Sequence, residues 1–276
     1  LIDIDKYDVK ILAQRWGDTR WGYLADHGDK VFTPRLIPSL TSQPDVWVQI
    51  TIPNEFKKVG KYNIGVTAGM ETDLCDPSWI QGGNNMDLIL ASSQHTVDAF
   101  NKSRFDMKNE QTGAVSRLEL TTKVEILFEG ADISKYFPIK ESVTLNEELS
   151  LLKNTLDNIE EKFCFLTTGH WMQGAFGEDR KNIGFTIKSF LETFKNRKNA
   201  PALVMKCHTS STSIMDRNRI LKKINQVKNT VKGKVPNIYL LHGEISDAGM
   251  NYLYNHNKIK ALVSLPKGEG FGRPFL

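Results

Sequence analysis

The sequence has few cysteines and no apolar run long enough to cross a membrane. Its three cysteines, Cys75, Cys164 and Cys207, are widely spaced and form no Cys-x-x-Cys pair. An odd, scattered set argues against a disulfide framework and a zinc site, and it favours a reducing compartment. No apolar stretch approaches the roughly 18 residues that a membrane-spanning helix needs. We therefore expect a cytoplasmic protein, although a peripheral membrane contact stays open.

Charge of one sign is also scarce. The 36 basic and 32 acidic side chains give a formal net charge of +4, and no block of lysines or arginines stands out. This balance predicts no specificity for nucleic acid and suits an anionic small ligand equally well, so charge does not decide the function. The Gly-x-Gly-x-x-Gly signature of a dinucleotide-binding oxidoreductase is absent too, although residues before Leu1 could carry one. The chain shows neither an internal repeat nor a low-complexity tract.

Apolar, β-branched runs alternate with helical stretches in both halves of the 276 residues. The expected strands of the first half are residues 8–14, 45–51, 63–69 and 87–93, with helices starting behind Asp76 and Ser93 and a strand pair within 117–132. Those of the second half are 163–169, 201–208, 237–243 and 260–266, separated by helices at 182–198, 213–231 and 246–257. Continuous apolar strands joined by helices predict parallel sheets that are covered on both faces.

This pattern predicts an α/β protein with two Rossmann-like parallel-sheet domains. The expected division is residues 1–143 for the first domain, 144–162 for an exposed connecting helix or linker, and 163–276 for the second domain. The chain begins on an apolar run without Met and ends inside a glycine-rich turn. We expect it to be truncated at both ends, so that the first strand of domain one and the last part of domain two are missing.

The glycine-rich turn at residues 266–274 follows the last expected strand. In open α/β sheets, ligands bind beyond the carboxyl ends of the strands, where glycines let the backbone come close. A carboxylate such as Glu269 accepts hydrogen bonds from sugar hydroxyls. Taken alone, this turn is as well explained by a plain strand-to-helix connection with a solvated glutamate.

The residues around the turn resemble the C-terminal domain of family 4 glycosyltransferases, which have the two-domain GT-B fold. The matching positions are Gly243, Ile245, Ser246, Leu253, Tyr254, Pro266 and the run Glu269-Gly270-Phe271-Gly272-Arg273-Pro274. In the first half, Glu71, Thr72, Pro77, Trp79, Asp87 and Ser93 match a subset of the same family. The family's second glutamate would be the residue after Leu276.

The resemblance implies a retaining, metal-independent enzyme that takes sugar from a nucleotide-diphosphate donor, with no other cofactor. Residues 163–276 would hold the donor and residues 1–143 the acceptor, a hydroxyl of a sugar, lipid or protein. Glu269 and the backbone of Gly270, Phe271 and Gly272 would hold the sugar. Glu71 is a second candidate catalytic carboxylate, because it follows a strand of the first domain.

The diphosphate needs cations, and the resemblance assigns Lys181 to it, just before the helix at 182–198. The family has an arginine where this chain has His170, which carries no fixed charge. Arg180 is a candidate substitute, and His242 and Ile245 are weaker candidates near the donor base. Without the resemblance, Arg180 and Lys181 are better explained as solvated charges. The alternative function is therefore a non-catalytic nucleotide- or sugar-binding protein of the same fold.

Overall fold

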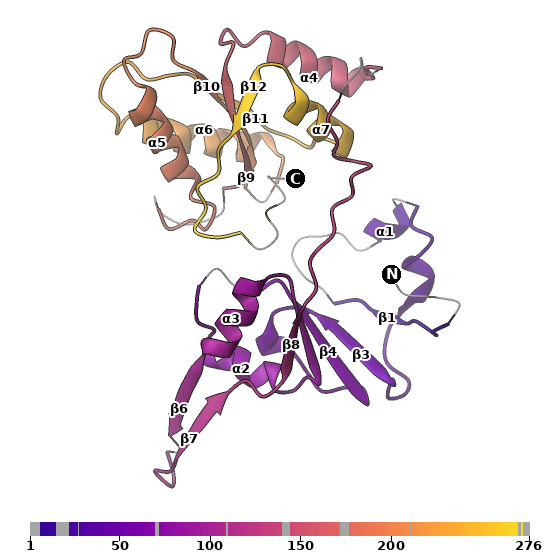
Figure 1. The fold of residues 1–276 in the computed structure, drawn as a ribbon. Coiled ribbons are helices and arrows are strands. Elements are labelled where there is room, and N and C mark those ends of the chain that lie inside the picture. The colour runs from indigo at the N-terminus through magenta and orange to yellow at the C-terminus, as the bar shows by residue number, and fades with distance from the viewer. Residues whose placement is uncertain are drawn as a thin grey trace.

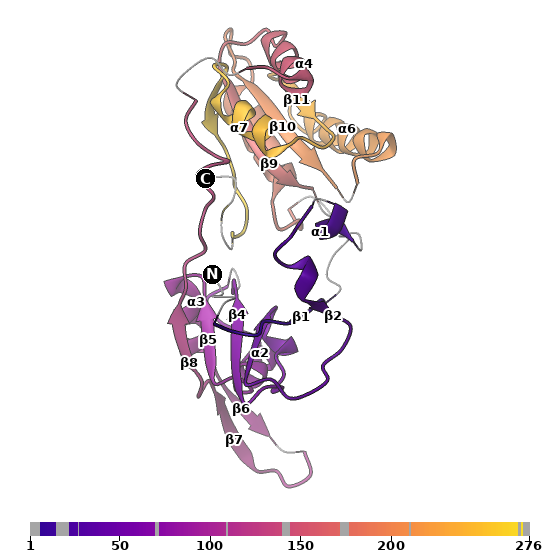
Figure 2. The same cartoon turned by 90° about the vertical axis from the view of Figure 1, so that its right-hand side faces the viewer.

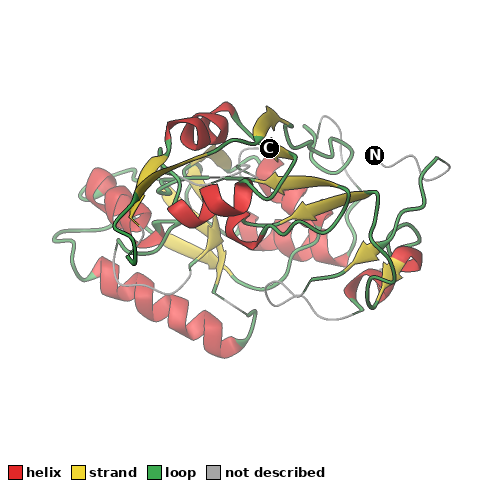
Figure 3. Ribbon diagram, turned by 90° about the horizontal axis from the view of Figure 1, so that it is seen from below, coloured by secondary structure: helices red, strands yellow, loops and turns green. Residues whose placement is uncertain are grey.

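The computed structural model describes residues 6–14, 22–26, 28–69, 72–108, 110–139, 144–171, 177–209, 211–269 and 272. Two four-stranded parallel sheets dominate it, and each belongs to a separate lobe (Figure 1). Figure 3 distinguishes the strands of both sheets from the helices around them. The prediction of an α/β protein with two parallel sheets is confirmed.

The N-terminal sheet has the strand order β3-β4-β5-β8. Its strands are β3 (Val46–Ile50), β4 (Tyr62–Thr67), β5 (Leu88–Ala91) and β8 (Lys123–Ile126), and its helices are α2 (Pro77–Gly83) and α3 (Gln94–Lys102). Asp76 and Ser93 cap the two helices, as expected, by accepting hydrogen bonds from Ser78 N and Thr96 N. These helices build a core with Ile80, Ile89 and Phe100, each fully buried.

The C-terminal sheet has the order β11-β10-β9-β12. Its strands are β9 (Cys164–His170), β10 (Ala202–His208), β11 (Ile238–Leu241) and β12 (Ile259–Leu262), and its helices are α4 (Glu147–Asp157), α5 (Ile183–Phe194), α6 (Ile214–Lys228) and α7 (Asp247–Asn255). Along β10, Leu203 and Met205 pack with α5 and α6, whereas Ala202 and Val204 face α4 and α7. Both faces of this sheet are therefore covered.

Three expectations about elements need correction. The expected strand at 8–14 is reduced to β1 (Ile11–Leu12), which pairs with β2 (Leu36–Ile37) outside the main sheet. The stretch 117–132 is not a strand pair. β7 (Val115–Glu119) pairs in antiparallel fashion with the preceding strand β6 (Arg104–Lys108), while β8 joins the parallel sheet. Helix α4 is not an exposed connector, because Leu149, Leu152 and Leu156 along it are buried. The short helices α1 (Tyr23–Asp26), η1 (Thr33–Arg35) and η2 (Pro53–Glu55) complete the fold.

The chain crosses between the lobes after β8, and the end of this segment is tied to α7. Phe137 N and Ile139 N donate to the side-chain oxygens of Asn251 and Asn255, at 3.1 and 2.9 Å. The Tyr136 hydroxyl donates to Asp247 Oδ1 at 3.1 Å. In two perpendicular views, the carboxyl ends of the two sheets point toward one another (Figures 1 and 2). Among the described residues, no helix combines the length and apolar character that a membrane crossing requires.

Candidate functional site

The predicted site residues of the second half gather at the carboxyl edge of the C-terminal sheet. Because its strands are parallel, His170 at the end of β9 and His208 at the end of β10 come to the same edge. His242 directly follows β11, and the segment 263–269 follows β12. The order of the strands brings the residues after β9 beside those after β12, although about ninety residues separate them in the sequence.

Lys181 and Glu269 form an ion pair at this edge. The Lys181 ammonium donates to both carboxylate oxygens of Glu269, each at 2.6 Å. Their side chains are only 19% and 17% exposed. The backbone fixes the contact, because Lys267 N donates to Arg180 O at 3.0 Å and the Arg180 guanidinium donates to Gly268 O at 3.3 Å. The structure thus brings Glu269, Lys181 and Arg180 together; what they bind stays a prediction.

The first turn of α5 is capped from within the chain. The buried Asp179 carboxylate accepts hydrogen bonds from Asn182 N at 3.1 Å and Ile183 N at 2.9 Å. Asn182 has φ of +55°, a left-handed conformation that asparagine tolerates better than most residues. These two N–H groups beside Lys181 are therefore occupied within the chain and are not free for a diphosphate. An aspartate four residues ahead of Ile183 was the signal for this cap, and sequence reasoning missed it.

His170 lies against His208, with ring centroids 4.2 Å apart and the planes tilted by 52°. Burial is the main cause that lowers the pKa of His170, and the neighbouring His208, Lys181 and Lys206 lower it further. Burial, followed by the charge of Lys206, also lowers the pKa of His208. The sequence alone did not identify His208 as a site residue, because nothing in it shows that β9 and β10 align these two imidazoles.

His242 and Ile245 are held by their own neighbours. His242 Nε2 lies 3.0 Å from Asp216 Oδ2, and both side chains are buried. Asp216 also accepts a hydrogen bond from Thr209 N at 2.9 Å. Ile245 packs closely against Gly249 of α7. A Cβ added to Gly249 would lie 2.4 Å from Ile245 Cγ2. The structure places His242 beside the histidine pair and Ile245 toward α7.

Other candidates lie outside this cluster or outside the described residues. Glu71, Gly270 and Phe271 belong to the residues that are not described; Gly272 is described and has φ of +78°. Gly69, at the end of the described residues before Glu71 in the sequence, lies so close to α3 that a Cβ on it would be 2.1 Å from Thr96 Oγ1. Trp171, which follows β9, is only 6% exposed and belongs to the core.

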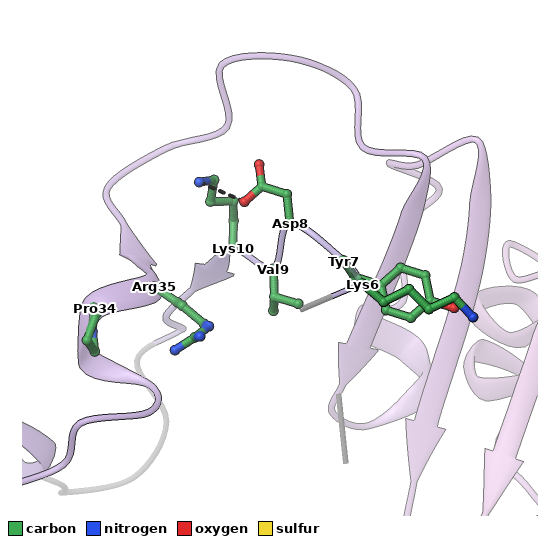
Figure 4. Close-up of a pocket in the computed structure, with 7 residues that line it drawn as sticks. All are labelled: Lys6, Tyr7, Asp8, Val9, Lys10, Pro34 and Arg35. Atoms are coloured by element: carbon green, nitrogen blue, oxygen red, sulfur yellow. Dashed lines mark ion pairs between the residues drawn. The ribbon is translucent and has the colours of Figure 1, made fainter. Parts of the chain in front are cut away.

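Two hollows lie away from this edge. One, of about 450 Å³, is lined by residues 6–10 with Pro34 and Arg35, and includes the ion pair of Lys10 with Asp8 at 3.0 Å (Figure 4). The other, of about 370 Å³, lies where Ile139 meets α4 and the end of α7. Neither contains a predicted site residue. Within the described ranges, no three His, Cys, Asp or Glu side chains gather as metal ligands would.

Comparisons with known proteins give weak structural likenesses. No family model matches the sequence, and no curated protein matches it. A trehalose-6-phosphate structure from E. coli bound with UDP-2-fluoro glucose is similar at a TM-score of 0.48 and 11% identity, over 83% of this chain and 54% of the other. A trehalose-6-phosphate synthase is similar at 0.44 and 10%, over 74% and 46%. Another, studied with bisubstrate glycomimetics for glycosyltransfer with retention, is similar at 0.46 and 10%, over 84% and 54%.

The chain spans about half the length of these structures. None of the three is described as a family 4 enzyme. Likenesses of this strength do not establish a shared activity, so a functional assignment has to come from the residues of the site itself.

Proposed function

We propose that this chain belongs to a retaining glycosyltransferase with the GT-B fold, which moves a sugar from a nucleotide-diphosphate donor to a hydroxyl acceptor. One observation carries the proposal: the ion pair of Lys181 with Glu269 at the carboxyl edge of the C-terminal sheet. A sugar diphosphate needs a cation for the phosphates and an acceptor for the sugar hydroxyls within one ligand's length. The pair provides both, at the edge of a parallel sheet where ligands are commonly bound.

The ion pair also explains how the site would stay ordered without donor. Two partly buried charges are stable there because each neutralises the other. A bound diphosphate would take over the Lys181 ammonium, with Arg180 beside it. Glu269 would then be free to accept hydrogen bonds from the sugar, while the backbone of Gly270, Phe271 and Gly272 lies next to it in the sequence. His170, His242 and Ile245 would surround the rest of the donor.

In transfer, the bond from the sugar to the diphosphate breaks and negative charge grows on the departing phosphate. Fixed cations that meet this charge lower the barrier, so Lys181 and Arg180 would act by electrostatic stabilisation. Glu71 would approach the acceptor or the reacting sugar from the N-terminal lobe. The motifs around Glu269 and Glu71 support membership of family 4, retention and independence from metal.

Three buried, unpaired cysteines fit a protein of the cytoplasm. The acceptor is a hydroxyl of a sugar, lipid or protein. The second candidate function is non-catalytic binding of a nucleotide or sugar. It is favoured by His170 at the position of an arginine in the resembling family, and by Asp179, which occupies N–H groups of α5.

The test uses the full-length protein, with UDP-, GDP- and ADP-sugars and a set of hydroxyl acceptors. We expect release of nucleoside diphosphate with one donor, and at least a hundredfold slower release in Lys181→Ala and Glu269→Gln. Lys61→Ala is the matched control, because Lys61 pairs with Asp45 at 2.7 Å on the other lobe. Tight binding of a donor without release of diphosphate would favour the non-catalytic alternative, and equal rates in all three variants would refute the assigned site.

A further inference from the structure

Two imidazoles meet at the carboxyl edge, between the ends of β9 and β10. His170 and His208 are register partners in the parallel ladder, which sets their rings 4.2 Å apart. Trp171 N donates to His208 O at 2.9 Å and fixes the backbone around the pair. His208 Nδ1 is buried, and it has no hydrogen-bond partner among the residues that the structure describes. A buried ring nitrogen without a hydrogen-bond partner is costly, and a bound ligand could supply that partner.

Several charged groups surround the histidine pair, and most of them already have hydrogen-bond partners. The groups that face it or lie beside it are Asp179 and Lys181 before α5, Lys206 and Cys207 on β10, Asp216 on α6, His242 and Glu244 after β11, and Glu269 after β12. Asp179 caps α5, Asp216 holds Thr209 and His242, and Glu269 holds Lys181. Lys206 donates to Gly243 O at 2.6 Å.

This arrangement keeps the free pair neutral. Partial desolvation disfavours an imidazolium, more at half-buried His208 than at His170, which is exposed at the end of β9. The nearby ammonium groups of Lys181 and Lys206 disfavour it further, so the pKa of both histidines lies below the ordinary value of 6.5. An anion placed beside Lys181 would reverse the balance, because it neutralises the ammonium and attracts positive charge on the rings.

We propose that the His170–His208 pair is a proton-coupled phosphate subsite, which takes up one proton from solvent when a diphosphate binds beside Lys181 and releases it when the diphosphate leaves. The inference rests on the proposed function. In the bound state, one imidazolium donates a hydrogen bond to phosphate and supplies the positive charge that a guanidinium would supply permanently. His208 thereby becomes a ligand-binding residue, and His170 replaces an arginine with a cation that exists only while the anion is present.

The sign of the pH dependence follows from this exchange. Between the free and the bound pKa of the pair, binding consumes a proton, so affinity falls as pH rises. One proton gives at most about a tenfold loss of affinity per pH unit within that window. Below the free pKa and above the bound pKa, affinity becomes independent of pH.

Calorimetry on the full-length protein tests this directly. The probes are UDP-glucose, GDP-mannose and ADP-glucose, because the diphosphate of a nucleotide sugar is esterified at both ends and lacks the phosphate group that titrates near neutral pH. Titrations at about pH 7 in two buffers with different ionisation enthalpies give the number of protons taken up. We expect about half to one proton per donor bound, and about threefold to tenfold weaker binding at about pH 8 than at about pH 6.5.

Variants assign the proton to the pair. His170→Gln and His208→Gln should each bind the donor with the weak affinity that the parent shows at high pH, and without proton uptake. His95→Gln is the matched control, an exposed histidine of α3 whose ring contacts Thr72 O at 3.2 Å; it should behave as the parent does. If neither pair variant folds, the proton count of the parent still decides the question.

The outcomes separate the two proposals. A donor that binds without proton uptake overturns the subsite and leaves the proposed function standing. If no donor binds at any pH, both proposals fail. Proton-coupled binding without sugar transfer supports the subsite and favours the non-catalytic alternative. Proton uptake that persists in both pair variants places the proton on another group and overturns the subsite.

Discussion

The two parallel sheets differ in how their faces are covered. In the C-terminal sheet, neighbouring residues of β9 and β10 alternate between two buried clusters, one on each face. In the N-terminal sheet, a single cluster lies under α2 and α3. On the opposite face, Val46, Val48 and Ile50 of β3 are 54%, 51% and 75% exposed. Both sheets have the apolar composition of a sheet that is covered on both faces. Among the described residues, only the C-terminal sheet is covered on both faces.

The difference shows that the apolar composition of the strands indicates that both faces of a sheet need covering, but it does not show whether other parts of the chain cover them. The register aligns Val48 with Ile64 and Ile64 with Leu88, so the open face carries apolar side chains across three strands. Parallel sheets with one apolar face in water are rare, because helices normally cover both. Stability should therefore depend much more on the C-terminal sheet than on this face.

The largest expected effect tests that contrast. Leu203→Ala in β10 removes a side chain that is fully buried, and it should lower the free energy of unfolding by about 2–5 kcal/mol. Ile50→Ala, on the open face, should change it by less than about 0.5 kcal/mol. Denaturant unfolding of both variants measures the difference. An equally large loss in Ile50→Ala would mean that this face is covered in the folded protein.

Much of this contrast could be predicted from the sequence, and part of it could not. The apolar runs at 163–169 and 201–208 identified β9 and β10 because they satisfy both faces of a strand at once. The run at 8–14 looked similar, yet it pairs only over two residues with β2. Whether an apolar run finds a partner depends on segments far away in the chain, such as Leu36–Ile37, and local patterns carry no information on that.

The candidate site shows the same limit. The proximity of Lys181 and Glu269 was expected only through the family resemblance, which assigned both to one donor. The parallel sheet brings them together, because its strands end at a common edge. The cap of α5 by Asp179 and the meeting of His170 with His208 were not predicted. They depend on the left-handed turn at Asn182 and on the register between β9 and β10.

A second comparison concerns the ion pairs of the two lobes. Lys181–Glu269 is mostly shielded from water, whereas Lys61 and Asp45 are 67% and 86% exposed. A double-mutant cycle with Lys181→Met and Glu269→Gln should give a coupling energy on the order of 1 kcal/mol. The same cycle at Lys61 and Asp45 should give no measurable coupling, because solvent screens the charges. Equal couplings in the two cycles would show that the C-terminal edge is wetter than the structure indicates.

The smallest expected effect concerns the group that caps α5, which is charged, whereas the group that caps α3 in the other lobe is neutral. Ser93 caps α3 with a neutral hydroxyl, whereas α5 is capped by the carboxylate of Asp179. That negative charge lies near the assigned diphosphate position and repels it. Asp179→Asn keeps an oxygen that can accept from the helix and removes the charge, so donor affinity should rise about twofold to fivefold, as 0.3–1 kcal/mol of charge interaction implies.

Calorimetry with the donor that binds best measures this change in affinity. Ser93→Ala is the control, because it removes a helix cap on the other lobe at a comparable cost to helix stability. The control should leave donor affinity unchanged. A gain of affinity in Asp179→Asn that disappears at high salt would agree with a charge effect, because screening weakens the repulsion that the substitution removes. Weaker binding in Asp179→Asn would show instead that the carboxylate positions Lys181 for the donor, and that the order it gives to α5 outweighs its repulsion of the phosphates.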